Sequence, residues 1–234
     1  MSGRICLPFF VKRIVRSFDV RFRFFESLLY SSRVLELGCG RYPASITIKA
    51  LYPEIEIHGV DIVPKNEVPD FVLYKIVDLD HGTLPYPDDH FNAVIFTHVI
   101  EHLRAPLRLG KEINRVMKTG AKIYVETPNW TTMFVPSFGF HREQHRPFNF
   151  FDDPSHLKPW TKHGLFEFLF QSCSLRVLTI GTVRNWLRIP PDFIKVFVGL
   201  IKGNREYIIV AFCNLYGSCI YGVGEKARST ARAT

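Results

Sequence analysis

Val34-Leu35-Glu36-Leu37-Gly38-Cys39-Gly40 is the stretch that decides which fold this sequence predicts. Its apolar run predicts a short buried strand over residues 33–37, which carries one acid and passes directly into a turn with two glycines. Glycine adopts backbone conformations that other residues avoid, and it lets a ligand approach the main chain closely. A helix that begins after such a turn points its free amides at the ligand. The stretch therefore predicts a ligand-binding strand, turn and helix.

Outward from this turn, short apolar strands alternate with helices along most of the chain. Further strands are expected at residues 56–60, 71–77, 93–96, 122–126, 175–182 and 207–213. Helices are expected at residues 45–52, 161–170 and 191–201, and over a helical stretch at 98–117 in which Pro106 begins the second half. This alternation predicts an α/β protein with a parallel sheet and helices on both faces.

The chain has room for one such domain. Its 234 residues are 47% hydrophobic, which suits a single large core. We assign the domain to residues 31–215, after a helical lead-in at 1–30. An aromatic insertion at about 128–160 interrupts the alternation, and the tail at 216–234 is expected to be disordered because its end is polar.

Acidic residues follow the next two strands. Asp61 ends the strand at 56–60, and Asp78-Leu79 ends the strand at 71–77. A carboxylate at the first position can accept both hydroxyls of a ribose, and Asp78 can accept the amino group of adenine while Leu79 packs on the ring. Each acid alone is equally typical of a helix cap or a turn. Together with Glu36 they occupy three successive strand ends, where open α/β sheets bind their ligands.

These motifs, with Phe91-Asn92-Ala93-Val94, the block from His98 to Leu103 and the turn before Gly120, resemble the class I S-adenosylmethionine-dependent methyltransferases. Within that family the chain is most similar to the small-molecule subgroup that includes ubiquinone-pathway and glycan-modifying O-methyltransferases. The resemblance covers residues 30–130 well and continues through 153–156 and 161–170, but it is not specific in 1–25 or 184–234. It implies a Rossmann-like, seven-stranded, mostly parallel sheet whose antiparallel last strand is the one expected at 207–213.

The resemblance also implies S-adenosylmethionine as cofactor and assigns its contacts. The glycine turn would line the methionine part, and the glutamate before it would order the turn and hold the amino group. The second strand end would hold the ribose and the third the adenine. In chain order, the implied contacts are Glu36, Gly38, Cys39, Gly40, Asp61, Ile62, Asp78 and Leu79. Arg41-Tyr42-Pro43 departs from the usual small polar run of the family.

Histidines are the candidates for catalysis. Methyl transfer from a sulfonium is an in-line displacement, for which the protein supplies position and electrostatics. An oxygen acceptor of high pKa needs a base, and histidine suits that role near neutral pH, whereas a carboxylate acceptor needs none. The candidates are His98, His141 and His145, in that order. For each of them, a structural or solvent-exposed histidine is the alternative interpretation.

The block from His98 to His102 raises the question of a metal. At helical spacing His98, Glu101 and His102 would share one face. Ubiquinone-pathway relatives carry glutamate at the position of His98 and bind a divalent metal there. Because His98 departs from that pattern, we predict no metal site. The alternative role for Glu101 and His102 is to anchor this segment against the sheet.

The insertion and the charge bear on the acceptor. Aromatic residues such as Trp130 and Phe134 predict a wall and lid for a ring, a sugar or a lipid-linked group, or else an extension of the core. The net charge is +8, but no nucleic-acid-binding motif is present. An RNA methyltransferase and a non-catalytic binding module stay open as alternatives, whereas Pro43 disfavours a nicotinamide enzyme.

Two further features concern location. The lead-in helix either covers an edge of the sheet or touches an anionic membrane surface through basic residues such as Arg21 and Arg23. The five cysteines are odd in number and lack a Cys-x-x-Cys spacing, which favours reduced thiols in a cytoplasmic protein. The oligomeric state is not encoded in any motif.

Overall fold

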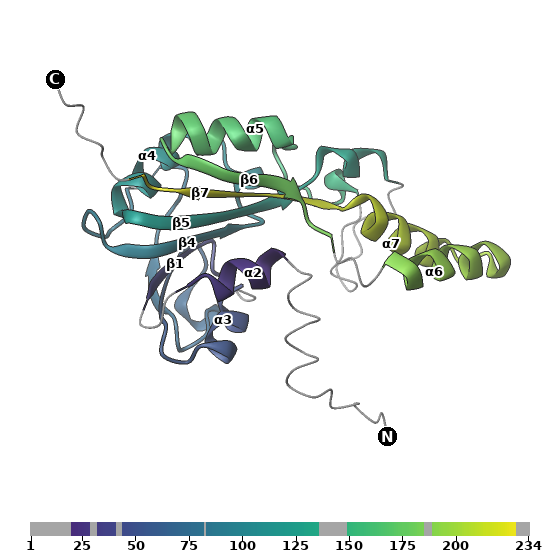
Figure 1. The fold of residues 1–234 in the computed structure, drawn as a ribbon, viewed down its shortest axis with the longest axis horizontal. Coiled ribbons are helices and arrows are strands. Elements are labelled where there is room, and N and C mark those ends of the chain that lie inside the picture. Colours follow the sequence, from purple (N-terminus) through teal and green to yellow (C-terminus); the bar gives the residue numbers. More distant parts are fainter. Residues whose placement is uncertain are drawn as a thin grey trace.

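One seven-stranded sheet organises the molecule (Figure 1). The computed structural model describes residues 20–28, 32–40, 44–81, 83–135, 149–184 and 189–227. The strand order is β3-β2-β1-β4-β5-β7-β6. The strands are β1 (Arg33–Leu37), β2 (Glu56–Asp61), β3 (Leu73–Ile76), β4 (Phe91–Thr97), β5 (Met117–Pro128), β6 (Arg176–Thr182) and β7 (Cys219–Glu225). The sheet is parallel except for β7, which runs antiparallel between β5 and β6, and this confirms the predicted fold class.

Helices α2 (Val20–Glu26) and α3 (Ser45–Leu51) cover one face of this sheet, and α4 (Pro106–Val116) and α5 (Lys162–Glu167) cover the other. Helices α6 (Ile189–Lys202) and α7 (Arg205–Tyr216) follow β6 along the chain. Short turns of helix follow several of the strands: η1 (Lys65–Glu67), η2 (Ile100–His102), η3 (Trp130–Phe134), η4 (Phe150–Asp152) and the π-helical η5 (Phe168–Ser172). As predicted, α4 begins at Pro106 and Thr161 caps α5, with its side chain accepting from the Gly164 amide at 3.0 Å.

Alternation along the central strands explains why both faces are covered. Leu35 of β1 packs in one core cluster with α4 and α5, whereas Val34 packs in a second cluster with α2 and α3. Strands that are covered on both faces are largely apolar, and β1 and β4 are buried along most of their length. The glycine turn after β1 therefore starts from a strand that is held rigidly from two sides.

The prediction for the last strand is wrong. Residues 207–213 belong to helix α7, which Asn204 caps by accepting from the Tyr207 amide at 3.1 Å. An apolar run of this length suits a helix as well as a strand. The antiparallel strand is β7, so the domain continues through residues that were assigned to a disordered tail.

Two glycines hid β7 from the sequence pattern. Glycine ordinarily weakens a strand, yet here it allows close packing. A Cβ at Gly222 would lie 2.8 Å from Leu169 Cδ1, and a Cβ at Gly224 would lie 3.2 Å from Leu175 Cδ1. These glycines let Leu169 of η5 and Leu175, the residue before β6, pack closely against β7.

The helical stretch expected after β4 is also wrong in its first half. His98 has a φ of +55°, and only one turn of helix, η2, precedes α4. His98, Glu101 and His102 therefore do not share the face of one helix.

At the N-terminus, Phe24 and Phe25 of α2 are buried against the sheet, while residues 1–19 lie outside the described part. Among the described residues, no helix is both long and apolar enough to cross a membrane.

Candidate functional site

The carboxyl ends of four parallel strands meet at one edge of the sheet. Leu37 of β1 is in register with Val60 of β2 on one side and Phe96 of β4 on the other. Glu126 of β5 lies beside the end of β4, and β7 begins next to it. The glycine turn, Asp61 and His98, which were predicted from separate motifs, therefore lie along one edge.

The glycine turn at this edge admits no larger residue. Gly38 has a φ of +74°, and a Cβ there would lie 2.1 Å from Val99 Cγ2. Its amide donates to the Val60 carbonyl at 2.8 Å. The turn thus rests against the segment that follows β4, which places it next to His98. The amide of Gly40 continues the turn and donates to the Asp61 carboxylate at 2.8 Å.

Glu36 ties the end of β1 to the start of α3. Its buried carboxylate accepts from the amides of Ala44 at 2.6 Å and Ser45 at 3.2 Å. Burial raises the pKa of Glu36 to about 7, although these hydrogen bonds favour the charged form. The predicted role of Glu36 in ordering the turn agrees with these contacts. Residues 41–43 lie outside the described part of the chain.

The residues predicted to hold the nucleoside differ in their placement. Asp61 also accepts from the Ile62 amide at 2.6 Å, and the side chain of Ile62 is exposed beside it. Asp78 is exposed and contacts His81 Nδ1 at 2.9 Å, whereas Leu79 packs in the core. The side chain of Cys39 is buried too, in contact with the position of Gly59. Cys39 could therefore meet a ligand only through its main chain.

This edge fits S-adenosylmethionine. A main-chain turn that approaches closely, a carboxylate fixed by two amides and an exposed apolar side chain beside it are what a nucleoside with a ribose requires. Gly38, Gly40, Asp61 and Ile62 would hold the cofactor at this edge. Asp78 stays a prediction for the adenine, because its exposed carboxylate reaches the same edge at the next strand.

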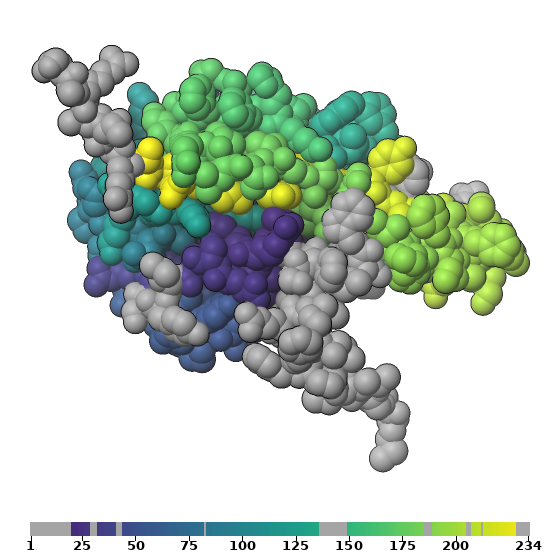
Figure 2. All heavy atoms as spheres, viewed as in Figure 1, coloured from purple at the N-terminus to yellow at the C-terminus, as the bar shows by residue number. Residues whose placement is uncertain are grey.

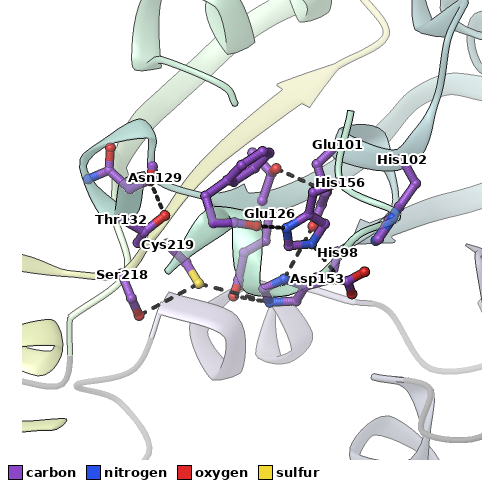
Figure 3. Close-up of polar contacts among 12 residues, drawn as sticks. His98, Glu101, His102, Glu126, Asn129, Thr132, Asp153, His156, Ser218 and Cys219 are labelled. Carbon is purple, nitrogen blue, oxygen red and sulfur yellow. Dashed lines mark hydrogen bonds and ion pairs between the residues drawn. The ribbon is translucent and has the colours of Figure 1, made fainter. Parts of the chain in front are cut away.

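His98 lies between two buried carboxylates (Figure 3). Its Nδ1 is 3.5 Å from Glu101 Oε1, and its Nε2 is 3.3 Å from Glu126 Oε1. The thiol of Cys219, at the start of β7, is 3.9 Å from Nε2. Burial favours the neutral ring, but contacts with Cys219, Glu101 and Glu126 outweigh it and raise the pKa of His98 well above its usual value.

Glu126 is a site residue that the sequence analysis missed. It is buried, and it accepts from Tyr124 Oη at 2.6 Å and from Arg21 Nε at 2.7 Å. Burial favours the neutral acid, but His98 and Arg21 outweigh it and hold the pKa of Glu126 far below its usual value. In the sequence, Glu126 ends the apolar strand expected at residues 122–126. An acid at a strand end is the same pattern that identified Asp61. Arg21 gave no signal, because 105 residues separate it from Glu126.

Arg21 of α2 therefore has a different role from the membrane contact that was considered for it. Arg21 was counted among the basic residues that could touch a membrane. Its guanidinium instead pairs with both carboxylate oxygens of Glu126. Within the described part of α2, this leaves only Arg23 as a cation for such a surface.

Glu101 and His102 anchor neighbouring segments. Glu101 is fully buried and accepts from Thr127 Oγ1 at 3.0 Å, while its carbonyl accepts from the Leu157 amide at 2.9 Å. His102 Nδ1 lies 3.1 Å from the carbonyl of Ser155. These contacts support the structural alternative for both residues. Glu101 additionally faces His98.

Two groups of side chains bring possible metal ligands within 4.8 Å of one another. One comprises His98, Glu126 and Cys219, and the other comprises Glu101, His102 and His156. In the first group, Glu126 is already paired with the guanidinium of Arg21. In the second, His156 Nδ1 is engaged with the Phe150 carbonyl at 2.6 Å. Neither arrangement favours a divalent cation.

We expect methyl transfer to persist in the presence of EDTA. Magnesium prefers oxygen ligands, and the first group offers one carboxylate that a cation already neutralises. The measurement is the rate of methyl transfer after dialysis against chelator, with and without added magnesium. Loss of activity in chelator that magnesium restores would contradict this prediction.

His98 lines one of two cavities near this edge of the sheet, and the other lies beside the start of β7. One of about 280 Å³ lies between α2, α3 and the ends of β4 and β5, and its lining comprises Arg21, Phe22, Phe25, Ala44, Thr47, Thr97, His98, Tyr124 and Glu126. The other, of about 260 Å³, lies between η3 and the end of α7, and its lining comprises Thr131, Thr132, Phe134, Val135, Cys213, Tyr216, Gly217 and Ser218. Ser218 precedes the Cys219 that contacts the imidazole (Figure 3). His141 and His145 lie outside the described residues.

Comparisons with known proteins agree with this geometry. A family model described as a methyltransferase domain matches residues 11–167. A Mycolicibacterium smegmatis protein named "Probable S-adenosylmethionine-dependent methyltransferase" is 34% identical over 103 residues, which are 42% of this chain and 39% of that protein. Ajmaline N-methyltransferase of Rauvolfia serpentina is 30% identical over 101 residues, 39% of this chain and 34% of that enzyme. The aligned part thus spans little more than a third of either relative.

A solved structure extends the likeness to nearly the whole fold. It is the complex between the Haloferax volcanii Trm112 methyltransferase activator and a methyltransferase, with a TM-score of 0.64 and 16% identity over 93% of this chain and 89% of that chain. At this identity the likeness concerns the fold alone. The domain match covers more than half of the sequence, and the sheet order and glycine turn agree with it. The chain belongs to the class I S-adenosylmethionine-dependent methyltransferases.

Proposed function

We propose that this chain transfers the methyl group of S-adenosylmethionine to an oxygen of a small-molecule, sugar or lipid-linked acceptor. One observation carries the proposal: His98 lies between two carboxylates, at the sheet edge that holds the glycine turn and beside an apolar cavity. A base, a cofactor edge and a space for an acceptor are thus adjacent.

Residues of the glycine turn and of β2 position the cofactor. S-adenosylmethionine supplies an electrophilic methyl group when it is bound. The main chain of Gly38 and Gly40 would line one side of its site, and the carboxylate of Asp61 would accept the ribose hydroxyls. Glu36 holds the turn against the start of α3. Because these contacts are rigid, the reacting atoms are held in line without further ordering.

His98 removes the proton of the acceptor hydroxyl. Both ring nitrogens face carboxylates, and the neutral ring takes that proton on the nitrogen that carries no hydrogen. The imidazolium that results is stabilised by Glu101 and Glu126, as the contact distances of 3.5 and 3.3 Å allow. Arg21 keeps Glu126 charged, so that it can stabilise the cation. The two carboxylates make the imidazole a stronger base than a solvated histidine.

The cavity between η3 and α7 suits the apolar part of an acceptor. Val135, Cys213 and the exposed ring of Phe134 line it, and Ser218 links it to Cys219 and thus to His98. An acceptor that places a ring or chain in this cavity could present its hydroxyl to the imidazole. The proposal keeps the aromatic insertion as a wall of the acceptor site, and it keeps His141 and His145 as further candidates for catalysis.

Transfer of a labelled methyl group tests the proposal. The purified protein is incubated with methyl-labelled S-adenosylmethionine and a cell extract, and the products are separated into organic-soluble, aqueous and RNA fractions. We expect the label on an oxygen of a small or lipid-soluble product, and we expect none with the His98→Gln variant. Label in RNA, label on nitrogen as in the ajmaline enzyme, or cofactor binding without any transfer would each contradict it.

A further inference from the structure

Helices α6 and α7 form an arm that stands out from the sheet (Figures 1 and 2). The helices approach closely at Gly199, where a Cβ would lie 2.8 Å from Ile208 Cγ1. The reversal between them uses Gly203, with a φ of +63°, and the cap Asn204. The arm is therefore a packed helical hairpin and not an extended loop.

A stripe of large apolar side chains runs along the outer side of α6. Successive members are one or three residues apart, which places them all on one side of the helix. Each has between 62% and 70% of its surface exposed. The members are Phe193, Ile194, Phe197, Leu200 and Ile201, and we call this set the α6 stripe. A contiguous exposed patch of this kind marks an interaction site, unlike scattered apolar residues.

The inner side of the same helix carries an ion pair beside the close contact at Gly199. Asp192 is fully buried, and the ammonium group of Lys195 lies 3.0 Å from its carboxylate. A helix of a water-surrounded hairpin has the opposite arrangement, with its apolar side inward. The outer side of α6 is therefore suited to contact with an apolar medium.

Positive charge accompanies the α6 stripe. Residues 184–216 contain five lysines or arginines and two acids, and one pair among them, Lys195 with Asp192, neutralises itself, which leaves an excess of three positive charges. Lys202 is exposed and follows the last member of the stripe directly. Anionic lipid headgroups attract such cations, whereas a second copy of the chain would oppose cations with cations. The charge thus selects an anionic bilayer over self-association.

We propose that the α6 stripe docks on the surface of a bilayer that contains anionic phospholipids. With 14 residues, α6 is shorter than the roughly 20 residues that a membrane-spanning helix needs, so it lies in the plane of the headgroups. Cys213 and Tyr216 of the adjoining α7 line the apolar cavity near His98, so docking brings this cavity to the bilayer. The docking itself does not depend on the proposed reaction, because the stripe shares no residue with the candidate site.

Co-sedimentation of the full chain with vesicles tests the docking. We expect the protein to sediment with phosphatidylcholine vesicles that contain phosphatidylserine, and to bind weakly to pure phosphatidylcholine. The double variant Phe193→Ser/Phe197→Ser should bind about tenfold more weakly, because it removes two of the apolar side chains that insert into the bilayer. Lys202→Glu should reduce the preference for the anionic vesicles. Both variants should keep the melting temperature of the wild type, since the altered side chains are exposed.

A matched control separates docking from nonspecific adhesion. Leu107 and Phe170 are exposed to a similar degree on α4 and η5, so Leu107→Ser/Phe170→Ser should sediment like the wild type. Equal binding by both double variants would overturn the proposal, as would absence of binding to either vesicle. A dimer in gel filtration that the α6 variant converts to a monomer would identify the stripe as a contact between copies and would also overturn it.

Discussion

Replacement of His98 by glutamine is expected to lower the turnover number about 10²–10⁴-fold, because general base catalysis contributes that much to a proton-dependent step. Glutamine keeps the size and polarity of the side chain but cannot accept the proton. The affinity for S-adenosylhomocysteine should stay near the wild-type value, since His98 is not among the residues that hold the cofactor. Single-turnover transfer and calorimetry measure the two quantities separately.

The pH profile gives this prediction a second readout. Because the pKa of His98 is raised well above its usual value, the base form of the ring grows as the pH rises toward that pKa. We therefore expect the wild-type rate to increase by about tenfold per pH unit below that pKa, and the increase to disappear in His98→Gln. His163→Gln, at an exposed position of α5, is the matched control and should leave the profile unchanged. A variant that kept the rising limb would show that another group is the base.

Replacement of Asp61 by alanine is expected to weaken binding of S-adenosylhomocysteine by about 1–3 kcal/mol, or roughly 5–150-fold. The substitution leaves two ribose hydroxyls without their acceptor. It also frees the amides of Gly40 and Ile62, which the carboxylate holds at 2.8 and 2.6 Å. Calorimetric titration measures the effect.

Two further variants separate these contributions. Asp61→Asn keeps one oxygen acceptor and should lose less affinity than alanine. Asp70→Ala removes an exposed carboxylate outside the site and should bind like the wild type. If calorimetry found unchanged affinity in Asp61→Ala, the assignment of this residue to the ribose would fail.

Local pattern was sufficient for the first five strands and for the glycine turn. The run from Val34 to Gly40 is apolar, acidic and glycine-rich, and the structure places it as a buried strand that ends in a tight turn. The family resemblance drawn from these motifs is confirmed by the methyltransferase domain match. Short-range signals work here because a strand end, its turn and the next helix are neighbours in sequence as well as in space.

The strand expected at residues 207–213 shows where local pattern fails. Its apolar residues suit either a strand or a helix, and the choice depends on Asn204 and on the close approach of Gly199 to α7. The true strand, β7, contains glycines that only the packing of η5 explains. Neither feature can be evaluated before the neighbouring elements are in place.

The environment of His98 was decided entirely by tertiary structure. The motif around His98 identified a candidate, but the ion pair of Arg21 with Glu126 joins α2 to β5 across 105 residues. Contact with Cys219 comes from 121 residues away. A pKa depends on burial and on charges within a few ångströms, whatever their distance along the chain. Residue order therefore specified the strand, the glycine turn and the acids of the proposed cofactor edge, whereas folding determined which charges surround His98.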